Sequence, residues 1–311
     1  MRILVALGGN AILQHTEKGT ADEQFRNVRY ACVQLAGIIK DGHQIVVTHG
    51  NGPQVGDILL RDEMAKEVLP PMPLDVCGAE SQGMIGYMIQ RSLREELKLW
   101  HMDTRVATIL SETVVDPGDE AFTKPSKPIG PFYTASEASE LKETKGWTMV
   151  NDSDRGYRRV VPSPRPLSIV ETPTISALLQ SGVVVIASGG GGIPVAEGVD
   201  GAIRGVEAVI DKDLAAAVLA SSVKADMLLM LTDVDNVFLD YAKPTARPLE
   251  RLTRADCIKY LEQGQFAEGS MKPKVEAAVS FIDAGGRVAS ISSLAGARQA
   301  VVLKAGTSIS A

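Results

Sequence analysis

The 311-residue sequence has few of the residues that build disulfide frameworks and metal sites. Its three cysteines, Cys32, Cys77 and Cys257, are odd in number and far apart, which favours free thiols in a reducing compartment over disulfides. Its four histidines do not have the spacing of metal ligands. We therefore predict a cytoplasmic protein that provides no metal site of its own.

The sequence also lacks an excess of positive charge and any long apolar run. Its net charge of −6 argues against a nucleic-acid-binding protein, which would usually be basic. No apolar run reaches the ~18 residues of a membrane span. The run from Ile3 to Leu7 resembles the core of a signal peptide, but Gly8-Gly9-Asn10 ends it too early, so we interpret it as a buried strand. We expect neither nucleic acid nor a membrane among the partners.

Two common nucleotide-binding motifs are absent as well. The sequence has no G-x-x-x-x-G-K-[ST] motif and no G-x-G-x-x-G after a strand, which excludes a Walker-type site and weakens a dinucleotide interpretation. Other glycine-rich loops follow apolar runs, at residues 8–10, 50–52 and 189–192. Backbone amides in such loops, followed by helices, can bind phosphate or carboxylate groups. For residues 189–192 taken alone, a simple turn remains the alternative.

Apolar patterning predicts strands that alternate with helices, which is typical of an α/β protein with a parallel sheet. The expected strands cover residues 3–7, 44–48, 105–115, 183–187, 207–210, 227–231 and 287–291, with an edge strand at the end of the chain. The expected helices cover residues 22–40, 54–67, 75–97, 172–181, 214–223, 254–263, 274–284 and 294–301.

Residues 116–168 differ in composition from the rest of the chain. Prolines and charged residues become frequent there, and the apolar periodicity fades. Long excursions of this kind within a compact fold are often functional. We predict an insertion or small subdomain outside the main sheet, which closes over the site as a lid.

Three lysines stand where an anion would explain them. Lys212 lies between two aspartates where a strand meets a helix, and Lys274 lies at a helix start, where a cation is unfavourable for the helix alone. Lys127 lies in a rigid, proline-rich part of the insertion, whereas Lys124 is interpreted as a surface residue. Lysines combined with amide loops suit phosphoryl transfer, which depends mainly on positioning and charge neutralisation.

No catalytic base is evident from the sequence. His49 is the obvious candidate, but no orienting partner can be named for it, so we interpret it as a residue that shapes its loop. An acceptor that is already an anion, such as a carboxylate, would need no base.

The motifs resemble those of the carbamate kinases, in the amino acid kinase superfamily. The resemblance runs the full length of the chain and rests on VALGGNAIL (5–13), THGNGPQVG (48–56), PLDVCGAESQGMIGY (73–87), KPIGPFYT (127–134), GGGGIPV (189–195), AVIDKDLAAAVLA (208–220), LTDVDNVFLDY (231–241) and GSMKPKVEAA (269–278). Sister kinases share the glycine loops and the Asp-Lys-Asp element, but not the 48–56, 73–87 and 127–134 segments in this form. Lys272 departs from the apolar residue expected before Pro-Lys, and we interpret it as a surface change.

The resemblance implies a fold and an assembly. It implies an open, mainly parallel eight-stranded sheet between layers of helices, in a single domain spanning residues 1–311. An N-lobe, residues 1–224, would bind carbamate and carry the protruding subdomain 116–168, and a C-lobe, residues 225–311, would bind the nucleotide. The family further implies a homodimer.

The resemblance also implies a reaction, the reversible conversion of ATP and carbamate to ADP and carbamoyl phosphate. Magnesium would be bound to the nucleotide phosphates. In the family this reaction often forms ATP, at the end of arginine fermentation or of ureide breakdown. Two alternatives remain open: a kinase of the same fold for another small carboxylate, and a nucleotide sensor without turnover.

Residue roles follow only from the resemblance. The carbamate and the transferring phosphoryl group would contact Gly8, Gly9, Asn10, Gly50, Asn51 and Gly52. Lys127 would close over the acceptor, Lys212 would bridge donor and acceptor, and Asp213 would orient the lysines, while Lys274 would hold the nucleotide phosphates. The nucleotide would contact Lys212, Asp233, Val234, Tyr241, Met271 and Lys274. The retention of all four residues of the catalytic set (Lys127, Lys212, Asp213 and Lys274) argues against the sensor.

Overall fold

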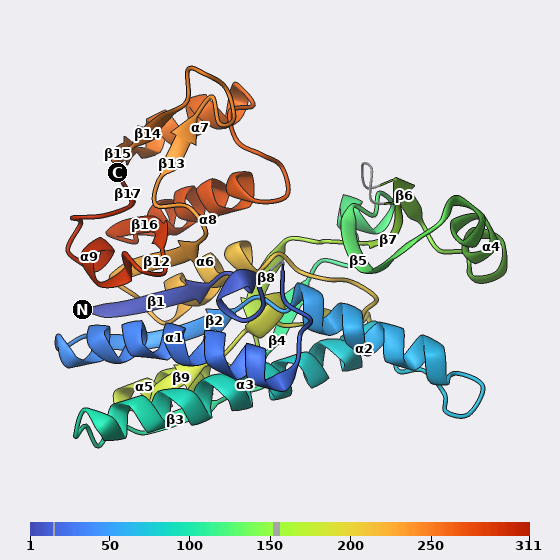
Figure 1. Cartoon of the computed structure of the whole chain (residues 1–311), viewed down its shortest axis with the longest axis horizontal. Helices are drawn as coiled ribbons and strands as arrows, with labels where there is room; N and C mark the ends of the chain where they lie inside the picture. The colour runs from blue at the N-terminus through green and yellow to red at the C-terminus, as the bar shows by residue number, and fades with distance from the viewer. Residues whose placement is uncertain (15, 152–155) are drawn as a thin grey trace.

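The computed structural model describes residues 1–14, 16–151 and 156–311, and an eight-stranded sheet forms its centre (Figure 1). The strand order is β15-β17-β16-β12-β1-β2-β9-β3. In that order the strands span Arg251–Thr253, Thr307–Ser310, Val288–Ser293, Met227–Thr232, Arg2–Leu7, Gln44–His49, Val184–Ile186 and Val106–Thr108. All neighbouring strands are parallel except β16 and β17, so the expected open, mainly parallel sheet is confirmed.

The β1 strand lies in the middle of this sheet, between β2 and β12. Val5 lies opposite Val47 on one side and Leu229 on the other, and all three are fully buried. A strand that is buried on both faces reads as a continuous apolar run, which explains the composition of residues 3–7. The carboxyl ends of β1, β2 and β12 therefore open at one edge of the sheet.

Helices cover both faces of the sheet because alternate side chains of each strand point to opposite sides. Ile3 and Val5 pack against α1 (Ala21–Lys40), α3 (Leu74–Leu99) and α9 (Ala297–Val301). Leu4 and Ala6 pack on the other side, in a core shared with α5 (Thr172–Gln180), α6 (Lys212–Ser222), α7 (Arg254–Glu262) and α8 (Met271–Asp283). The two apolar cores give the three-layer arrangement that was expected.

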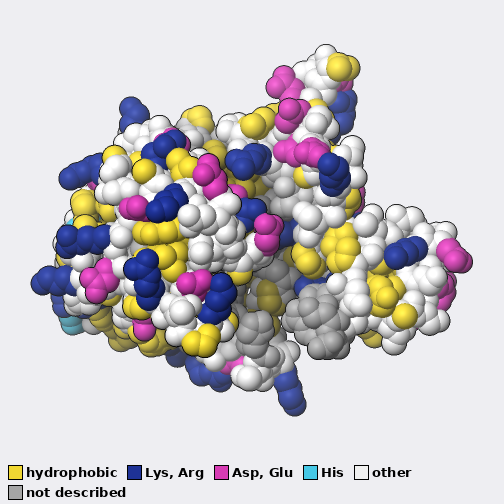
Figure 2. All heavy atoms as spheres, turned by 90° about the horizontal axis from the view of Figure 1, so that it is seen from above, with side chains coloured by type: hydrophobic (Ala, Val, Ile, Leu, Met, Phe, Trp, Pro, Cys, Tyr) yellow, Lys and Arg dark blue, Asp and Glu magenta, His cyan; other side chains and the backbone are white. Residues whose placement is uncertain are grey.

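A protruding subdomain extends from the main body, at the right of Figure 1. It has an antiparallel sheet in the order β5-β7-β6, formed by Lys127–Tyr133, Tyr157–Val161 and Met149–Asn151, together with α4 (Ala135–Lys145). Its β5 strand packs on α2 (Gly52–Ala65) of the main body. In the view from above, Lys and Arg side chains are interspersed with Asp and Glu, and the subdomain stands apart from the body (Figure 2).

Smaller sheets complete the fold. A four-stranded sheet has the order β11-β10-β4-β8, formed by Ile203–Gly205, Ile193–Glu197, Glu112–Val115 and Pro166–Ile169. A separate hairpin joins β13 (Val237–Leu239) and β14 (Arg247–Leu249). Short 3-10 helices form at Gly9–Ala11 (η1), Glu120–Phe122 (η2) and Gly189–Gly191 (η4). Among the described residues, no helix has the length and apolar character that crossing a membrane would require.

Three strand predictions are wrong. The single strand expected at 105–115 is two strands, because β3 pairs with β9 in the main sheet while β4 pairs with β10 in the second. Residues 207–210 form no strand, and β11 lies just before them, although Ala208 and Ile210 are buried by packing. The last strand, β17, is not at the edge, since β15 pairs along its outer side.

Candidate active site

The glycine loops that follow β1 and β2 lie side by side at the carboxyl edge of the sheet. Gly50 is so close to the first loop that a Cβ atom there would lie 3.2 Å from the Gly9 amide nitrogen. The same Cβ would lie 3.4 Å from Cδ of Lys212. Residues 8–10, residues 50–52 and Lys212 are thus brought together, as the sequence-based assignment requires.

The start of α2 and the third glycine loop are joined through Asn51. Asn51 is the N-cap residue of α2, so Gly52 lies in its first turn, where backbone amides are free to bind an anion. The Asn51 side chain donates to Oγ of Ser81 at 2.8 Å and lies directly against Gly190, where a Cβ would come within 2.2 Å of it. The loop at 189–192 therefore packs directly against a predicted site residue, and its part in anion binding stays a prediction.

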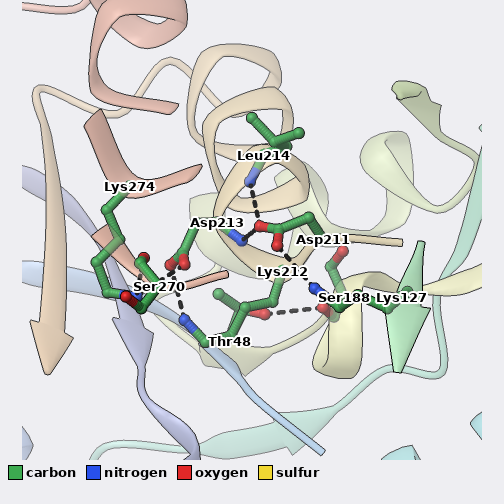
Figure 3. Close-up of polar contacts among 9 residues, drawn as sticks. All are labelled: Thr48, Lys127, Ser188, Asp211, Lys212, Asp213, Leu214, Ser270 and Lys274. Carbon is green, nitrogen blue, oxygen red and sulfur yellow. Dashed lines mark hydrogen bonds and ion pairs between the residues drawn. The ribbon is translucent and has the colours of Figure 1, made fainter. Parts of the chain in front are cut away.

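A buried charge cluster marks the first turn of α6 and the first turn of α8 (Figure 3). One oxygen of the Asp213 carboxylate accepts from Nζ of Lys212 at 2.7 Å, and the other accepts from Nζ of Lys274 at 3.0 Å. Asp213 is 4% exposed and Lys274 is 7% exposed. A single buried carboxylate therefore orients both lysines.

The charges in this cluster depend on one another. Burial alone would raise the pKa of the Asp213 carboxyl, but the neighbouring Lys212 and Lys274 outweigh it and lower the pKa to about 2. Burial lowers the pKa of the Lys212 amine, with Lys274 acting in the same direction and Asp213 opposing both. The carboxylate is thus ionised at any physiological pH and supports the charge of the two lysines.

Lys127 reaches the cluster from the protruding subdomain. Its Nζ donates to Oδ2 of Asp211 at 2.9 Å, and Asp211 is the N-cap residue of α6. Figure 3 shows Asp211 with Lys127 on one side of the α6 start and Asp213 with Lys274 on the other. The structure therefore gathers the three lysines of the predicted catalytic set around Asp211 and Asp213, at the start of α6.

His49 is buried and lacks access to a substrate. Its ring lies against Gly189, where a Cβ would come within 2.2 Å of Nε2, and its Nδ1 lies 3.0 Å from the Gly50 carbonyl oxygen. Burial lowers the pKa of its imidazole to about 4, with the Gly50 carbonyl opposing and the Lys212 charge reinforcing the shift. The ring is neutral at pH 7 and packs the two loops together, as the loop-shaping interpretation expected.

A cavity of about 230 Å³ lies beside the lysine cluster, between the end of β12 and the start of α8. Its lining includes the sequence-predicted nucleotide residues Asp233, Val234, Tyr241, Met271 and Lys274. Sequence reasoning missed the other lining residues, Thr232, Asn236, Phe238, Gln265, Phe266, Ala267 and Ser270. An apolar and aromatic wall with a lysine at one end suits a purine ring joined to a phosphate chain.

The two glycine loops predicted to bind the acceptor, residues 8–10 and 50–52, are called the acceptor loops, and Asn10 connects the first of them to this cavity. Its side-chain amide donates to the carboxylate of Asp233, so the first glycine loop and the cavity wall share one hydrogen bond. Gly8 also approaches this wall, because its amide donates to the Leu231 carbonyl at 3.0 Å. The first glycine loop and the cavity are therefore neighbours at the carboxyl edge of the main sheet.

Two residues next to the site were not selected from the sequence. Asp211 is the N-cap residue of α6, a position where aspartate is common, so the sequence gives no signal of a second role. Ser188 adopts the left-handed conformation, with φ of 54°, and its carbonyl accepts from Oγ1 of Thr48 at 2.8 Å. Positive φ at a serine cannot be read from composition, since the local sequence is dominated by glycine.

Among the described residues, no group of three or more His, Cys, Asp or Glu side chains is placed to bind a metal ion. Both oxygens of Asp213 are already bonded to lysines. These residues are compatible with a magnesium ion bound mainly through nucleotide phosphates and water, which is how magnesium is usually held.

Comparison with known proteins gives matches along nearly the whole chain. A profile of the amino acid kinase family matches residues 1–293. The chain is 50% identical to the carbamate kinase of Thermococcus kodakarensis over 311 residues, covering 99% of this chain and 98% of that protein. It is 47% identical to the carbamate kinase of Clostridium perfringens, with 99% of each chain covered. The solved structure of Giardia lamblia carbamate kinase bound to AMP-PNP superimposes with a TM-score of 0.94 at 45% identity, covering 99% of this chain and 98% of that one.

Proposed function

The chain belongs to the amino acid kinase family, and from this premise we propose that it is a carbamate kinase that transfers a phosphoryl group reversibly between ATP and carbamate. The observation that carries the proposal is the Asp213 carboxylate shared by Lys212 and Lys274 where the glycine loops meet. Identities near 50% to carbamate kinases over the full length support the same reaction.

The residues present suit a phosphoryl transfer to an anionic acceptor. The transferred group carries spread negative charge, and an enzyme acts on it mainly by positioning and neutralising that charge. Lys212 lies against Gly50 and is joined through Asp213 to Lys274, which lines the nucleotide cavity. In this proposal Lys212 bridges donor and acceptor, and Lys274 binds the nucleotide phosphates. Asp213 keeps both ammonium groups in place.

Carbamate needs no general base, because its attacking oxygen is already ionised. This agrees with the environment of His49, because burial lowers its pKa and leaves the ring neutral, with Nδ1 against the Gly50 carbonyl. The acceptor and the transferring group would instead be held by the amides of Gly9, Asn10, Asn51 and Gly52. The amides of Gly8 and Gly50 already donate to the Leu231 and Leu7 carbonyls, so these two glycines would contribute by letting the loops approach closely. Lys127 supplies the third positive charge, from the side of the subdomain.

The nucleotide occupies the cavity lined by Val234, Tyr241 and Met271, with its phosphates directed towards Lys274. Magnesium, bound to those phosphates, would neutralise charge on the donor. Asp233 lines the cavity at the point where it meets the acceptor loop. The alternative is a kinase that acts on a different small carboxylate, because carbamate is too small to require a distinctive pocket.

We also propose the homodimer, the cytoplasmic setting and the ATP-forming direction in arginine or ureide breakdown. The main sheet ends at β3, whose outer edge has no partner strand among the described residues. Beside it, α3 exposes Tyr87 and Leu99, at 55% and 70%. An unpaired edge next to exposed apolar side chains is a common dimerisation surface, and light scattering at several concentrations tests this.

The deciding experiment measures ATP formation from ADP and carbamoyl phosphate with magnesium, in a coupled assay. The wild-type protein is expected to form ATP, and Lys212→Ala is expected to reduce kcat by orders of magnitude with an unchanged circular dichroism spectrum. Lys272→Ala is the matched control, since Lys272 lies on the same helix as Lys274 but pairs with Glu268 at the surface. A normal rate in Lys212→Ala would contradict the assigned role.

The outcomes of this assay separate the alternatives. ATP formation that depends on Lys212 supports the carbamate kinase. No ATP from carbamoyl phosphate, with ADP still binding, moves the proposal to another acyl phosphate, which a panel of donors would identify. ADP binding without turnover on any donor indicates the nucleotide sensor.

A further inference from the structure

The carboxylate of Asp211 has two oxygens with different partners, and only one of them serves the helix. Oδ1 accepts from the backbone amides of Asp213 and Leu214, at 2.9 and 3.4 Å, which caps α6. Oδ2 accepts from Nζ of Lys127 at 2.9 Å. The side chain of Asp211 is 15% exposed, so the second contact is sheltered from water.

Capping alone does not explain an aspartate at this position. The helices α1, α4 and α7 are capped by Thr20, Thr134 and Thr253, whose hydroxyls accept from the backbone as a carboxylate would. Ser, Thr and Asn cap helices about as well as Asp. The extra property of Asp211 is its second oxygen and its charge, and both are directed at Lys127.

Lys127 depends on this contact for its position. It is the first residue of β5, at the base of the protruding subdomain, and its backbone pairs with Val161 of β7. Within the part of the chain that the structure describes, Asp211 is the one carboxylate that forms an ion pair with it. Its side chain keeps 34% exposure, so without Asp211 nothing described would hold the ammonium group near α6.

We propose that Asp211 is a positioning residue that holds the Lys127 ammonium group ready for the anionic acceptor. The proposal rests on the role proposed above for Lys127. An ammonium group has three N–H donors, so Lys127 can keep one hydrogen bond to Asp211 and direct the others at the acceptor. Preorganisation of this kind removes the entropy that a long side chain would otherwise lose each time the acceptor binds.

The test uses Asp211→Asn, which keeps the cap and removes the charge that holds Lys127. The KM for carbamoyl phosphate is expected to rise about tenfold, the effect of losing one charge-assisted hydrogen bond. The KM for ADP and the urea midpoint are expected to stay at wild-type values. Asp211→Ser, which also caps, is the second variant in case the first folds poorly.

The matched control is Glu207→Gln. Glu207 forms another ion pair between the subdomain and the body, with Arg159 at 3.3 Å, while its second oxygen accepts from the Leu74 amide. Removing that charge loosens the subdomain without touching Lys127, so the KM for carbamoyl phosphate should not change. An equal rise in both variants would overturn the proposal, because it would show a general anchoring effect.

A double-variant cycle decides whether Asp211 acts through Lys127. In a Lys127→Met background, adding Asp211→Asn is expected to change neither KM nor kcat further. A further loss of equal size in that background would overturn the proposal, as would an Asp211→Asn protein with unchanged or lower KM. If the wild type turns over and Lys127→Met has the same KM and kcat, the role proposed for Lys127 is rejected. If the wild type itself is inactive, the proposed function is rejected.

Discussion

Replacing Asp213 by asparagine tests the charge cluster most directly. The variant keeps the shape of the side chain but removes the charge that Lys212 and Lys274 share. The pKa of Asp213 is about 2, against an ordinary 3.8, and this difference corresponds to roughly 2–3 kcal/mol of stability. The two buried ammonium groups are also left to repel each other, so we expect a total loss of about 3 kcal/mol in the free energy of unfolding.

The pH dependence of that loss has a defined sign. Because folding lowers the pKa of Asp213, its contribution is complete above pH 3.8 and disappears as the pH falls towards 2. Urea unfolding should therefore show the full difference in the free energy of unfolding between the wild type and Asp213→Asn at pH 7, and a smaller difference below about pH 4. A loss smaller than about 1 kcal/mol at pH 7 would refute the view that Asp213 supports two charged lysines.

Anions provide a second readout of the same variant. With Asp213 neutral, the two ammonium groups form a stronger site for phosphate, so added phosphate should raise the urea midpoint of Asp213→Asn more than that of the wild type. The kcat for ATP formation should nevertheless fall by orders of magnitude, because the lysines are no longer oriented. Equal responses to phosphate in both proteins would show that the lysines do not face the anion site.

Two other predictions concern the packing beneath the site. Burial lowers the pKa of His49 to about 4, so the unfolded chain binds more protons than the folded protein between pH 4 and 6.5. The free energy of unfolding of the wild type should therefore fall by up to about 3 kcal/mol as the pH is lowered through that window. Urea unfolding should show a smaller fall for His49→Gln, which has no imidazole to protonate. Gly189→Ala would place a Cβ 2.2 Å from Nε2 of His49 and should cost about 1–3 kcal/mol. Gly83→Ala, at an open position of α3, should instead be neutral or stabilise by up to about 1 kcal/mol, and a loss in both variants would mean that the clash is not the cause.

The main sheet could be predicted from the sequence because its strands are buried on both faces. The runs at β1, β2 and β12 are continuous and apolar, and each ends at a loop that local composition marks clearly. The partners of a strand, by contrast, depend on residues far away in the chain. Ile109 and Leu110 continue the apolar run between β3 and β4, so nothing local shows that the chain changes sheets there.

Short pairings were missed for a related reason. The β15 strand has three residues, Arg251–Thr253, of which only Leu252 is buried, and this is too little to form a pattern. Because β15 pairs with β17, the edge strand of the sheet is β15 and not the last strand of the chain. The lobe boundary at residues 224 and 225 and the movement of residues 116–168 as a lid stay predictions.

The site itself was predictable where a residue conflicts with its local surroundings. Lysines at the starts of α6 and α8 are unfavourable for those helices, so Lys212 and Lys274 could be selected without a structure. Asp211 agrees with its surroundings as an N-cap residue, and Phe238 and Phe266 agree with an apolar core. Residues whose local role is satisfied give no signal of a second role, which only the arrangement in space reveals.

The arrangement of charge explains why the site needs both aspartates. Lys127, Lys212 and Lys274 bring three positive charges to the start of α6, where the helix dipole adds to the positive field. Asp211 and Asp213 balance two of those charges and leave an excess of one for the phosphate groups of the substrates. Loss of an aspartate should therefore disturb stability or lysine position first, whereas loss of a lysine should disturb phosphoryl transfer first. This division of effects is what distinguishes a preorganised transfer site from a set of surface ion pairs, where either loss would matter little.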